Sequence, residues 1–187
     1  MSKAAKAIFF KGKEEEIKAY PTNFFDVSAK DIKGNLVNFK DFEGKYKAFL
    51  VVNVACLCGY TYGNYKQLNE VFETYRERGL AIFAFPCNQF GGQEKGSEME
   101  IEEYVKNKFN SKFQLFSKIE VNGPNAHPLY NYLRRNSSLY NPETNKSKEI
   151  PWNFAKFLLD AKGNVVQFYS SEVDPNTFTG DIEKLVQ

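Results

Sequence analysis

Two cysteines, Cys56 and Cys58, stand where a predicted strand turns into a predicted helix. The apolar, β-branched run 48–54 before them is typical of a strand that is buried on both faces. Apolar residues at three- and four-residue steps within 65–75 predict an amphipathic helix after them. Cys58, followed by Gly59, therefore lies at a helix N-terminus, where unpaired amides and the helix dipole stabilise an anion such as a thiolate. We expect Cys58 to be a reactive nucleophile.

Other interpretations of these thiols stay open. Cys56 lies next to the strand and fits a small buried hydrophobe. A zinc site is disfavoured, because zinc needs about four ligands and the remaining thiol and the single histidine, Cys87 and His127, are far along the chain. The Cys-x-Cys spacing is also one residue short of the redox motif Cys-x-x-Cys. We expect neither a metal nor a cofactor.

A second group of polar side chains follows the next predicted strand, residues 80–85. The loop that continues to Glu94 combines a proline, two glycines and three side-chain amides, the last of them on Gln93. In open α/β sheets, sites form at the carboxyl ends of strands. Amides in such a loop are turn formers about as often as site residues, so the loop alone leaves the role of Gln93 open.

The remaining patterns predict the elements that position these residues. The strand, helix and strand of residues 48–85 form a βαβ unit, so the two strands should be parallel. A capping box opens a helix at Ser97, and a further helix starts at His127, for which capping or packing is the expected role. Patterns further predict hairpins around 33–35 and 160–164, a polar loop over 137–148 and a last helix from 174. Together they predict an α/β sandwich with a central mixed β-sheet flanked by helices.

Composition excludes several classes of partner. With 187 residues, 42% of them hydrophobic, the chain can bury a substantial core. Its 25 basic and 23 acidic residues are interleaved, so the net charge of +2 indicates no nucleic-acid surface. Three cysteines are too few for a disulfide scaffold, and no apolar run is long enough to span a bilayer. We therefore expect a cytoplasmic protein.

The first residues alternate Lys, Ala and Glu around one short apolar cluster, which is too short for a secretory signal. We expect residues 1–22 to form a loosely ordered N-terminal leader and residues 23–187 to form a single domain. A targeting segment removed from a longer precursor stays an alternative.

Four motifs resemble those of the glutathione peroxidase family. They are Asn53-Val54-Ala55-x-x-Cys58-Gly59-Tyr60-Thr61, the block 85–94, Lys118-Ile119-x-Val121-Asn122-Gly123 and Trp152-Asn153-Phe154. The resemblance runs from about Phe24 to the C-terminus and implies a thioredoxin-like fold. It also implies that Cys58 is the peroxidatic residue, which many animal members replace by selenocysteine. Gln93, Trp152 and Asn153 match the other three catalytic positions.

The resemblance also implies an oligomeric state and partners. The segment between Arg134 and Trp152 is too short for the subunit-contact loop of the tetrameric members, so the chain is more similar to the monomeric phospholipid-hydroperoxide type. Its implied substrates are hydrogen peroxide and lipid hydroperoxides, the latter met in transient contact with membranes. The implied reductant is thioredoxin or glutathione.

The chemistry of peroxide cleavage agrees with the four assigned residues. A thiolate attacks one oxygen while charge develops on the departing alkoxide, so the site needs preorganised donors. Gln93 and Asn153 offer amide N–H groups, and Trp152 offers an indole N–H. A single tryptophan is more often a core residue, but Asn153, between two aromatic residues in a strand-like pattern, is harder to explain by packing. The product is a sulfenic acid at Cys58, which another thiol must reduce.

The chain departs from the family in the position of its thiols. Cys56 stands where serine is usual, which leaves it as a bystander, a trap for the sulfenic acid or a site of damage. Many thioredoxin-using members carry a resolving cysteine in the stretch that corresponds to 103–109, where this chain has Lys106. Cys87 is then the remaining candidate for a resolving residue, and thioredoxin and glutathione both stay open as donors. A cysteine that replaces a natural selenocysteine at position 58 is a further alternative.

Three functions compete at this point. The leading one is a thiol peroxidase that acts through Cys58. A general thiol-disulfide oxidoreductase is disfavoured, because it needs Cys-x-x-Cys and gives Gln93 and Asn153 no role. A non-enzymatic redox sensor would keep the fold and report oxidation to a partner.

Overall fold

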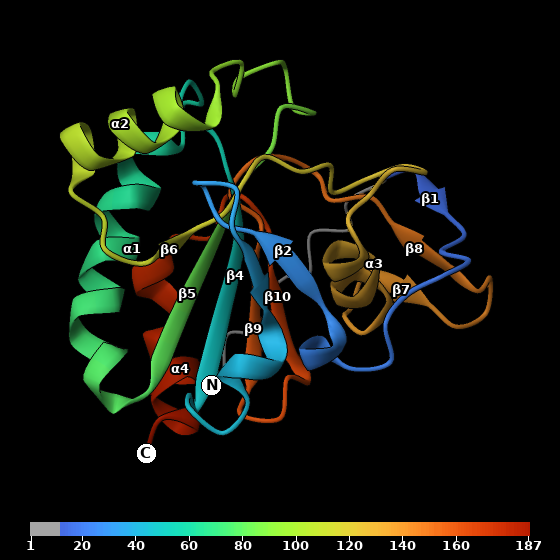
Figure 1. Ribbon diagram of the computed structural model, residues 1–187. Helices are drawn as coiled ribbons and strands as arrows, with labels where there is room; N and C mark the ends of the chain where they lie inside the picture. Colours follow the sequence, from blue (N-terminus) through green and yellow to red (C-terminus); the bar gives the residue numbers. More distant parts are fainter. Residues whose placement is uncertain (1–11) are drawn as a thin grey trace, which may run out of the picture.

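A five-stranded mixed sheet forms the centre of the molecule, in the order β10-β9-β4-β5-β6 (Figure 1). The structure is a computed structural model and describes residues 12–187. β4 (Ala48–Val54) and β5 (Leu80–Pro86) are parallel along their whole length. β6 (Gln114–Leu115) extends this parallel part, and β9 (Lys156–Asp160) with β10 (Val165–Tyr169) adds an antiparallel hairpin on the other side. The predicted βαβ unit and mixed sheet are therefore confirmed.

Helices cover both faces of this sheet. α1 (Thr61–Tyr75), α2 (Glu98–Phe109) and α4 (Thr179–Leu185) lie on one face, and α3 (Pro128–Arg135) lies on the other (Figure 1). The 3-10 helices are η1 (Phe24–Asp26), η2 (Phe39–Phe42), η3 (Arg76–Arg78) and η4 (Pro175–Phe178). Ser97 opens α2 with the predicted capping box, and His127 caps α3 by accepting the N–H of Leu129. Within residues 12–187, no helix has both the length and the apolarity needed to cross a membrane.

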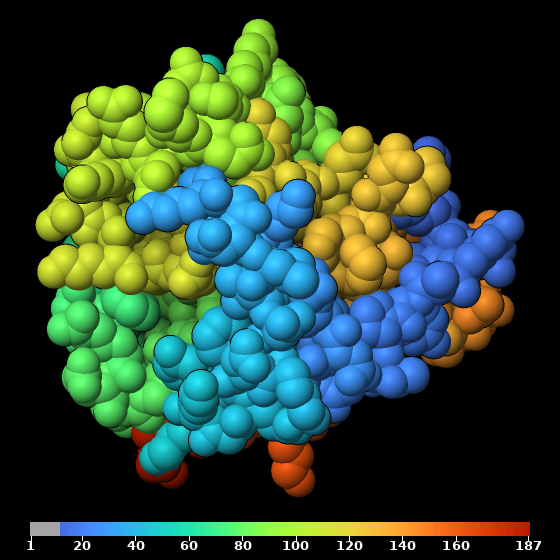
Figure 2. Space-filling model, in the orientation of Figure 1, coloured from blue at the N-terminus to red at the C-terminus, as the bar shows by residue number. Residues whose placement is uncertain are grey.

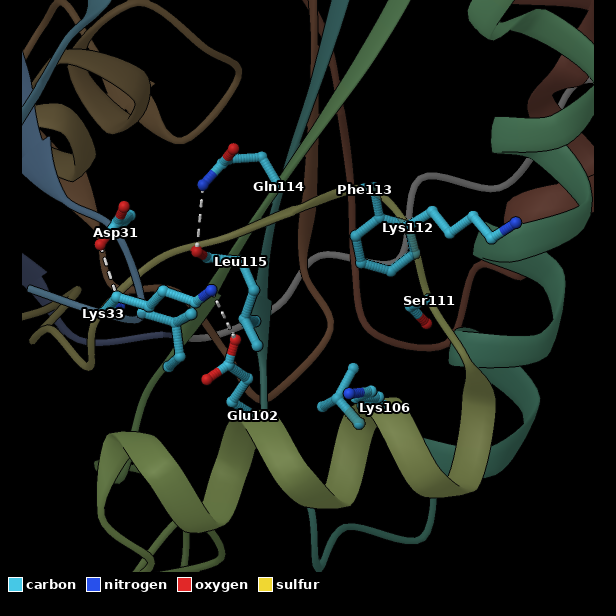
Figure 3. Close-up of a pocket in the computed structure, with 11 residues that line it drawn as sticks. Asp31, Lys33, Glu102, Lys106, Ser111, Lys112, Phe113, Gln114 and Leu115 are labelled. Atoms are coloured by element: carbon cyan, nitrogen blue, oxygen red, sulfur yellow. Dashed lines mark hydrogen bonds and ion pairs between the residues drawn. The ribbon is translucent and has the colours of Figure 1, made fainter. Parts of the chain in front are cut away.

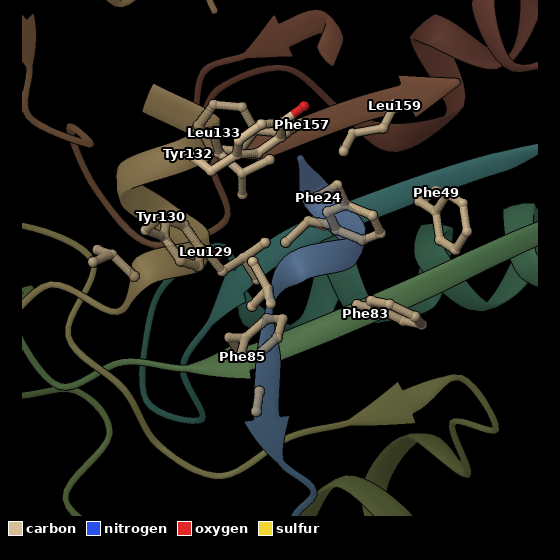
Figure 4. Close-up of a cluster of buried hydrophobic side chains, with 14 of the residues drawn as sticks. Phe24, Phe49, Phe83, Phe85, Leu129, Tyr130, Tyr132, Leu133, Phe157 and Leu159 are labelled. Atoms are coloured by element: carbon tan, nitrogen blue, oxygen red, sulfur yellow. The ribbon is translucent and has the colours of Figure 1, made fainter. Parts of the chain in front are cut away.

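Side chains of β4 alternate between two hydrophobic clusters, because successive residues of a strand point to opposite faces. Phe49 and Val51 pack toward α3, with Phe24 and Phe83 among their neighbours (Figure 4). Leu50 and Val52 belong to the cluster on the α1 side. Since both faces are covered, all seven residues of β4 are buried, as the apolar run predicted.

A small sheet replaces the polar loop predicted over residues 137–148. β7 (Tyr140–Asn141) and β8 (Lys146–Lys148) form a hairpin, and β1 (Glu14–Glu15) pairs with the free side of β8. Asn145 in the connecting turn takes a left-handed backbone with φ of 54°, which asparagine tolerates better than most residues. The loop prediction was wrong because strands of two or three residues carry no periodic signal.

The expected leader is partly attached to the rest of the molecule. Glu15 accepts hydrogen bonds from the buried guanidinium of Arg134 and from the N–H of Gly123. Residues 12–47, in blue and cyan, extend across the front of the molecule in Figure 2. A loosely ordered leader is therefore not found at Glu14 and Glu15, which are held by strand pairing; residues 1–11 lie outside the described part of the chain.

Two hairpins use the same five-residue turn. One joins β2 (Ser28–Lys30) to β3 (Leu36–Asn38), and the other joins β9 to β10. Their sequences are Asp31-Ile-Lys-Gly-Asn35 and Asp160-Ala-Lys-Gly-Asn164. In each, the aspartate carboxylate accepts from the backbone N–H groups two and four residues later and from the asparagine side chain. The β9-β10 hairpin was predicted from this five-residue turn, and the β2-β3 hairpin from the last three residues of its turn, Lys33-Gly34-Asn35.

Candidate active site

Three loops meet at one edge of the central sheet, where β4 and β5 end (upper part of Figure 1). The loop with Cys58 follows β4, and the loop with Gln93 follows β5. Since β9 runs antiparallel to β4, the Trp152-Asn153 turn before β9 reaches the same edge. The backbone N–H of Leu57 donates to the carbonyl of Gln93 at 3.1 Å, which joins the first two loops directly.

Cys58 lies at the strand-to-helix turn, as the sequence predicts. Its side chain is buried but reachable, with 9% of the residue exposed. The backbone N–H of Tyr60 donates to Sγ at 3.5 Å, so the sulfur accepts from an amide at the start of α1. Thr61 fixes the turn, since its Oγ1 accepts from the Cys58 N–H at 3.1 Å and its hydroxyl donates to the Ala55 carbonyl at 2.6 Å.

Gln93 and Asn153 are brought together by a side-chain hydrogen bond. Asn153 Nδ2 donates to Gln93 Oε1 at 2.9 Å. This leaves the Gln93 amide N–H groups available to a ligand, because no acceptor within residues 12–187 takes them. Asn153 is fully buried, and its Oδ1 has no hydrogen-bond partner in the described part of the chain. A polar pair of this kind can orient donors toward a third molecule.

Trp152 lies in a tight turn at the rim and is 38% exposed, so it is not the core residue that a single tryptophan usually is. Its ring packs against Phe90, with the ring centroids 5.8 Å apart. The strand-like pattern assumed around Asn153 was wrong, since β9 begins only at Lys156. Phe154 has a φ of 64°, which is rare for a bulky residue and bends the chain sharply.

Asn53 holds this turn from inside β4, and sequence reasoning missed that role. Its Nδ2 donates to the Trp152 carbonyl at 3.0 Å, and its own carbonyl accepts from the Phe154 N–H at 2.6 Å. The signal in the sequence was one asparagine in an otherwise apolar strand. A buried side-chain amide needs such partners. Within residues 12–187, Asn53 Nδ2 has one and its Oδ1 has none.

Cys87 does not join the other site residues. It is fully buried in the cluster on the α3 side, whereas Cys58 packs in the cluster on the α1 side. Burial raises the pKa of the Cys87 thiol to about 11, and its Sγ lies 3.6 Å from Gln89 Oε1. The two thiols therefore pack on opposite sides at the carboxyl edge of the sheet in this structure.

Cys56 is partly buried beside Glu94, the residue that follows Gln93. Burial, and next the negative charge of Glu94, raise the pKa of the Cys56 thiol strongly. Glu94 is 1% exposed, and burial raises the pKa of its carboxyl as well. No local pattern in the sequence marks this glutamate as buried.

Lys106, at the position where the family resemblance led us to look for a resolving cysteine, lies on α2. It lines a cavity of about 360 Å³ between α2 and β6, together with Lys112 and Phe113 (Figure 3). Lys33 and Glu102 form an ion pair across the same cavity, with Nζ and Oε1 3.9 Å apart. These side chains show no convergence on Cys58.

Apolar side chains are exposed next to Cys58. Leu57 is 65% exposed, Tyr60 42% and Tyr62 64%. Within residues 12–187, no three His, Cys, Asp or Glu side chains gather as a metal site would require. The exposed residues next to Cys58 are therefore aliphatic or aromatic, and the turn itself is uncharged; the exposed basic residues nearest to it in the two loops and the start of α1 are Lys66 and Lys95.

Comparisons with known proteins agree with this geometry. Residues 24–134 match the glutathione peroxidase family model. "Probable glutathione peroxidase 3, mitochondrial" of Arabidopsis thaliana is 48% identical over 88% of this chain and 77% of its own length. "Probable phospholipid hydroperoxide glutathione peroxidase" of Nicotiana sylvestris is 43% identical over 89% of this chain and 94% of its own. The crystal structure of T. cruzi GPX1 aligns with a TM-score of 0.69 and 28% identity, covering 88% of this chain and 97% of that one.

The expected thioredoxin-like fold is confirmed by the mixed sheet, by the helices on both of its faces and by these structural matches. The family match covers more than half of the chain, and it includes the loops of both Cys58 and Gln93. The relatives extend the similarity to most of the chain. This chain therefore belongs to the glutathione peroxidase family, and it is a peroxidase.

Proposed function

We propose that Cys58 is the peroxidatic nucleophile and that Gln93, Trp152 and Asn153 are its donors. One observation carries the proposal: Cys58 Sγ accepts from an amide at the start of α1, in a loop that is hydrogen-bonded to the backbone of Gln93. A helix N-terminus favours a thiolate over a neutral thiol. The side-chain amides of Gln93 and Asn153 then offer N–H donors to the alkoxide oxygen on which negative charge develops.

The proposed step transfers one oxygen to sulfur. The thiolate attacks the terminal oxygen of R–O–O–H, the O–O bond breaks, and Cys58 becomes a sulfenic acid. The alkoxide RO⁻ leaves, accepts hydrogen bonds from the side-chain N–H groups and takes up a proton to give ROH. One external thiol then forms a mixed disulfide with Cys58 and releases water, and a second thiol releases the reduced enzyme.

Stopped-flow measurement of peroxide consumption by the reduced protein, without any donor, tests this assignment. Cys58→Ser should abolish the reaction, whereas Cys56→Ser should keep most of it, because only Cys58 has its sulfur at the helix start. Equal losses in both variants would overturn the assignment of the nucleophile. Oxidation of the parental protein at the rate of an ordinary thiol would point instead to a redox sensor or a general thiol-disulfide oxidoreductase.

For regeneration, we propose an external donor that attacks the Cys58 sulfenic acid directly, with a thioredoxin-type protein preferred over glutathione. Two observations support this: Cys87 and Cys58 pack in different clusters, and the turn residues after Cys58 are uncharged, which leaves only Lys66 and Lys95 as candidate basic groups. An anionic tripeptide would need basic groups there, while a protein donor can cover apolar surface.

Mass spectrometry after one equivalent of peroxide tests the route. We expect a sulfenic acid at Cys58, or its adduct with an added thiol, and a free Cys87. A Cys58–Cys87 disulfide would instead establish Cys87 as the resolving residue and would require a rearrangement of the β5 end. Comparing turnover with thioredoxin and with glutathione then ranks the two donors.

The same proposal includes lipid hydroperoxides as substrates, reached through transient contact of Leu57, Tyr60 and Tyr62 with a membrane. It also treats the protein as a cytoplasmic monomer, with residues 23–187 as its peroxidase domain. Co-sedimentation with vesicles of peroxidised phospholipid tests the membrane contact, and size-exclusion chromatography tests the monomer. Microscopy of a fluorescent fusion tests the location.

A further inference from the structure

Asn122 lies in the motif 118–123, which the proposed reaction leaves without a role. It is 9% exposed, and its side-chain amide makes two hydrogen bonds to a single residue. Nδ2 donates to the Ile150 carbonyl at 3.0 Å, and Oδ1 accepts from the Ile150 N–H at 2.8 Å. Asn122 therefore pairs both backbone groups of Ile150, which is itself buried, and fixes the position of that residue.

Ile150 stands two positions before Trp152 in the chain. The residue between them is Pro151, whose ring fixes its own backbone φ and restricts the backbone of Ile150. The chain consequently has little freedom between the held isoleucine and the tryptophan. The position of Ile150 sets where the Trp152 turn begins.

The other end of the same turn is held by Asn53. This residue bonds to the Trp152 carbonyl and to the Phe154 N–H, which attaches the turn to β4. Residues 150–154 are thus held at both ends by asparagines that come from different parts of the chain. The backbone of Trp152 and Asn153 lies between the two attachments.

That backbone determines how two side chains meet Gln93. A Cβ on Gly91 would lie 3.5 Å from Trp152 Cη2 and 3.6 Å from Gln93 Cγ, so Gly91 lies against both side chains. Asn153 Nδ2 donates to Gln93 Oε1. The Trp152 ring packs on Phe90 but is partly exposed, so its place depends on its backbone as well as on packing.

We propose that Asn122 is a positioning residue, which acts through Ile150 to hold the Trp152 indole and the Asn153 amide beside Gln93. The inference rests on the proposed function, in which these side chains are donors. Donors stabilise a transition state only where they are correctly placed, and a shift of about 1 Å can cost about 10²-fold in rate. The Asn122 amide is itself bonded to Ile150, so it holds donors and does not act as one.

Fluorescence tests the position of the turn directly, because Trp152 is the single tryptophan of the chain. Acrylamide should quench Trp152 more strongly in Asn122→Ala than in the parental protein, since the turn loses its first attachment. Asn122→Asp at about pH 8 should change the quenching in the same direction, because a carboxylate has no N–H for the Ile150 carbonyl. This second variant keeps the side-chain volume and serves where Asn122→Ala does not fold.

Two reactions of Cys58 separate positioning from general damage. Its single-turnover oxidation by hydrogen peroxide, followed by stopped flow, should be about tenfold slower in both Asn122 variants. Its alkylation by iodoacetamide, located by mass spectrometry, should keep the parental rate, because attack on carbon leaves no alkoxide to stabilise.

Gln89→Ala is the matched control. Gln89 bonds to the backbone of Val121 and Asn122, so its removal weakens the same segment but leaves the Asn122 side chain on Ile150. We expect nearly parental quenching and oxidation in this variant.

Three results would overturn the positioning role of Asn122. They are parental quenching or parental oxidation in the Asn122 variants, an equal change in Gln89→Ala, and an equal fall in the oxidation and alkylation rates. Parental oxidation in Trp152→Phe would instead overturn the proposed function of Trp152 as a donor.

Discussion

Gln89 and Gln93 lie four residues apart in one loop but have different partners. Gln89 Oε1 accepts from the N–H groups of Val121 and Asn122 at 2.7 and 3.0 Å, and its Nε2 donates to the Asn122 carbonyl at 2.9 Å. The only side-chain bond of Gln93 within residues 12–187 is the one from Asn153. Gln89 therefore links its own loop to residues 121–122, whereas the amide N–H groups of Gln93 can donate to a ligand.

Gln93→Ala should therefore slow the oxidation of Cys58 by about 10²-fold with little change in stability, as expected for a lost oxyanion donor. Gln89→Ala is the matched control: it should lower the free energy of unfolding by about 2 kcal/mol, since it leaves buried amides unpaired, and change the rate little. Stopped-flow oxidation and urea denaturation measure the two effects. A Gln93→Ala protein with parental kinetics would remove this residue from the site.

The sequence allowed the position of Cys58 to be predicted because it follows a buried strand, which an apolar run marks. The same pattern placed Gln93 in a loop at a strand end, but its role came from the family resemblance. Trp152 and Asn153 came from the family resemblance alone. The contacts of Asn53 with the Trp152 turn join residues about a hundred positions apart, and the positive φ of Phe154 has no signal in an aromatic residue. Long-range hydrogen bonds of this kind cannot be inferred from local pattern.

At the scale of elements, the two Asp-x-Lys-Gly-Asn turns differ in their surroundings. Both glycines are left-handed, with φ of 87° at Gly34 and 80° at Gly163. A Cβ on Gly34 would meet open space, but one on Gly163 would lie 2.6 Å from Cβ of Phe24, which is fully buried. The β9-β10 turn is therefore packed against the core, and the β2-β3 turn is not.

Alanine at these two glycines should separate backbone strain from overpacking. Gly34→Ala should lower the free energy of unfolding by about 1 kcal/mol, from the unfavourable φ alone. Gly163→Ala should lower it by about 3 kcal/mol or more, because Phe24 must also move. Guanidinium denaturation measures the free energy of unfolding of both variants. Equal losses of this free energy would show that Phe24 moves aside without overpacking the core.

β9 was predicted as a strand, but its first residue is an unexpected core residue. Lys156 is fully buried, and its ammonium group donates to the carbonyls of Val173 and Ser171 at 2.7 and 3.5 Å. Burial lowers the pKa of Lys156 to about 8 from an ordinary value of 10.5. No local pattern distinguishes this lysine from an exposed one.

This depressed pKa predicts the direction of a pH effect on stability. Between about pH 8 and pH 10.5 the folded protein releases the Lys156 proton while the unfolded chain keeps it, so Lys156 makes the free energy of unfolding rise with pH. The contribution is at most about 3 kcal/mol across that window. Denaturation of the parental protein and Lys156→Met at several pH values should show a smaller slope in the variant. The same change at the exposed Lys162 should keep the parental slope.

At the scale of the whole molecule, one ion pair attaches the N-terminal strand to the interior. Arg134 is fully buried and donates to the carbonyls of Lys148, Val121 and Ser147 as well as to Glu15. Of these acceptors, Glu15 alone carries a charge. Pairing of β1 with β8 places that charge where the guanidinium needs it.

Glu15→Ala should therefore lower the free energy of unfolding by about 3 kcal/mol, because it leaves a buried guanidinium without its counter-ion. Glu14→Ala on the same strand should change it by less than about 0.5 kcal/mol, since within residues 12–187 the Glu14 side chain has one hydrogen bond, from the Thr144 hydroxyl. Urea denaturation measures both. Similar losses of unfolding free energy in the two variants would mean that water alone compensates the buried charge of Arg134 when Glu15 is removed.

The mixed central sheet and the parallel pairing of β4 with β5 could be predicted, because these two strands are long, apolar and linked by a βαβ unit. The small sheet could not, because β1 and β8 are short, polar and more than 130 positions apart. Its stability comes from Arg134 and from packing around α3, which only the folded molecule brings together.

The packing of Cys58 and Cys87 in different clusters has a consequence for the lifetime of the enzyme. In the proposed cycle, no internal thiol reduces the Cys58 sulfenic acid. An oxidised molecule then stays a sulfenic acid until a donor thiol reacts with it, and a second peroxide that reacts first converts it irreversibly to the sulfinic acid. The fraction of molecules that reach the sulfinic acid therefore depends on the ratio of donor thiol to peroxide in the surrounding solution. In the proposed cycle, the enzyme inactivates itself when that ratio falls.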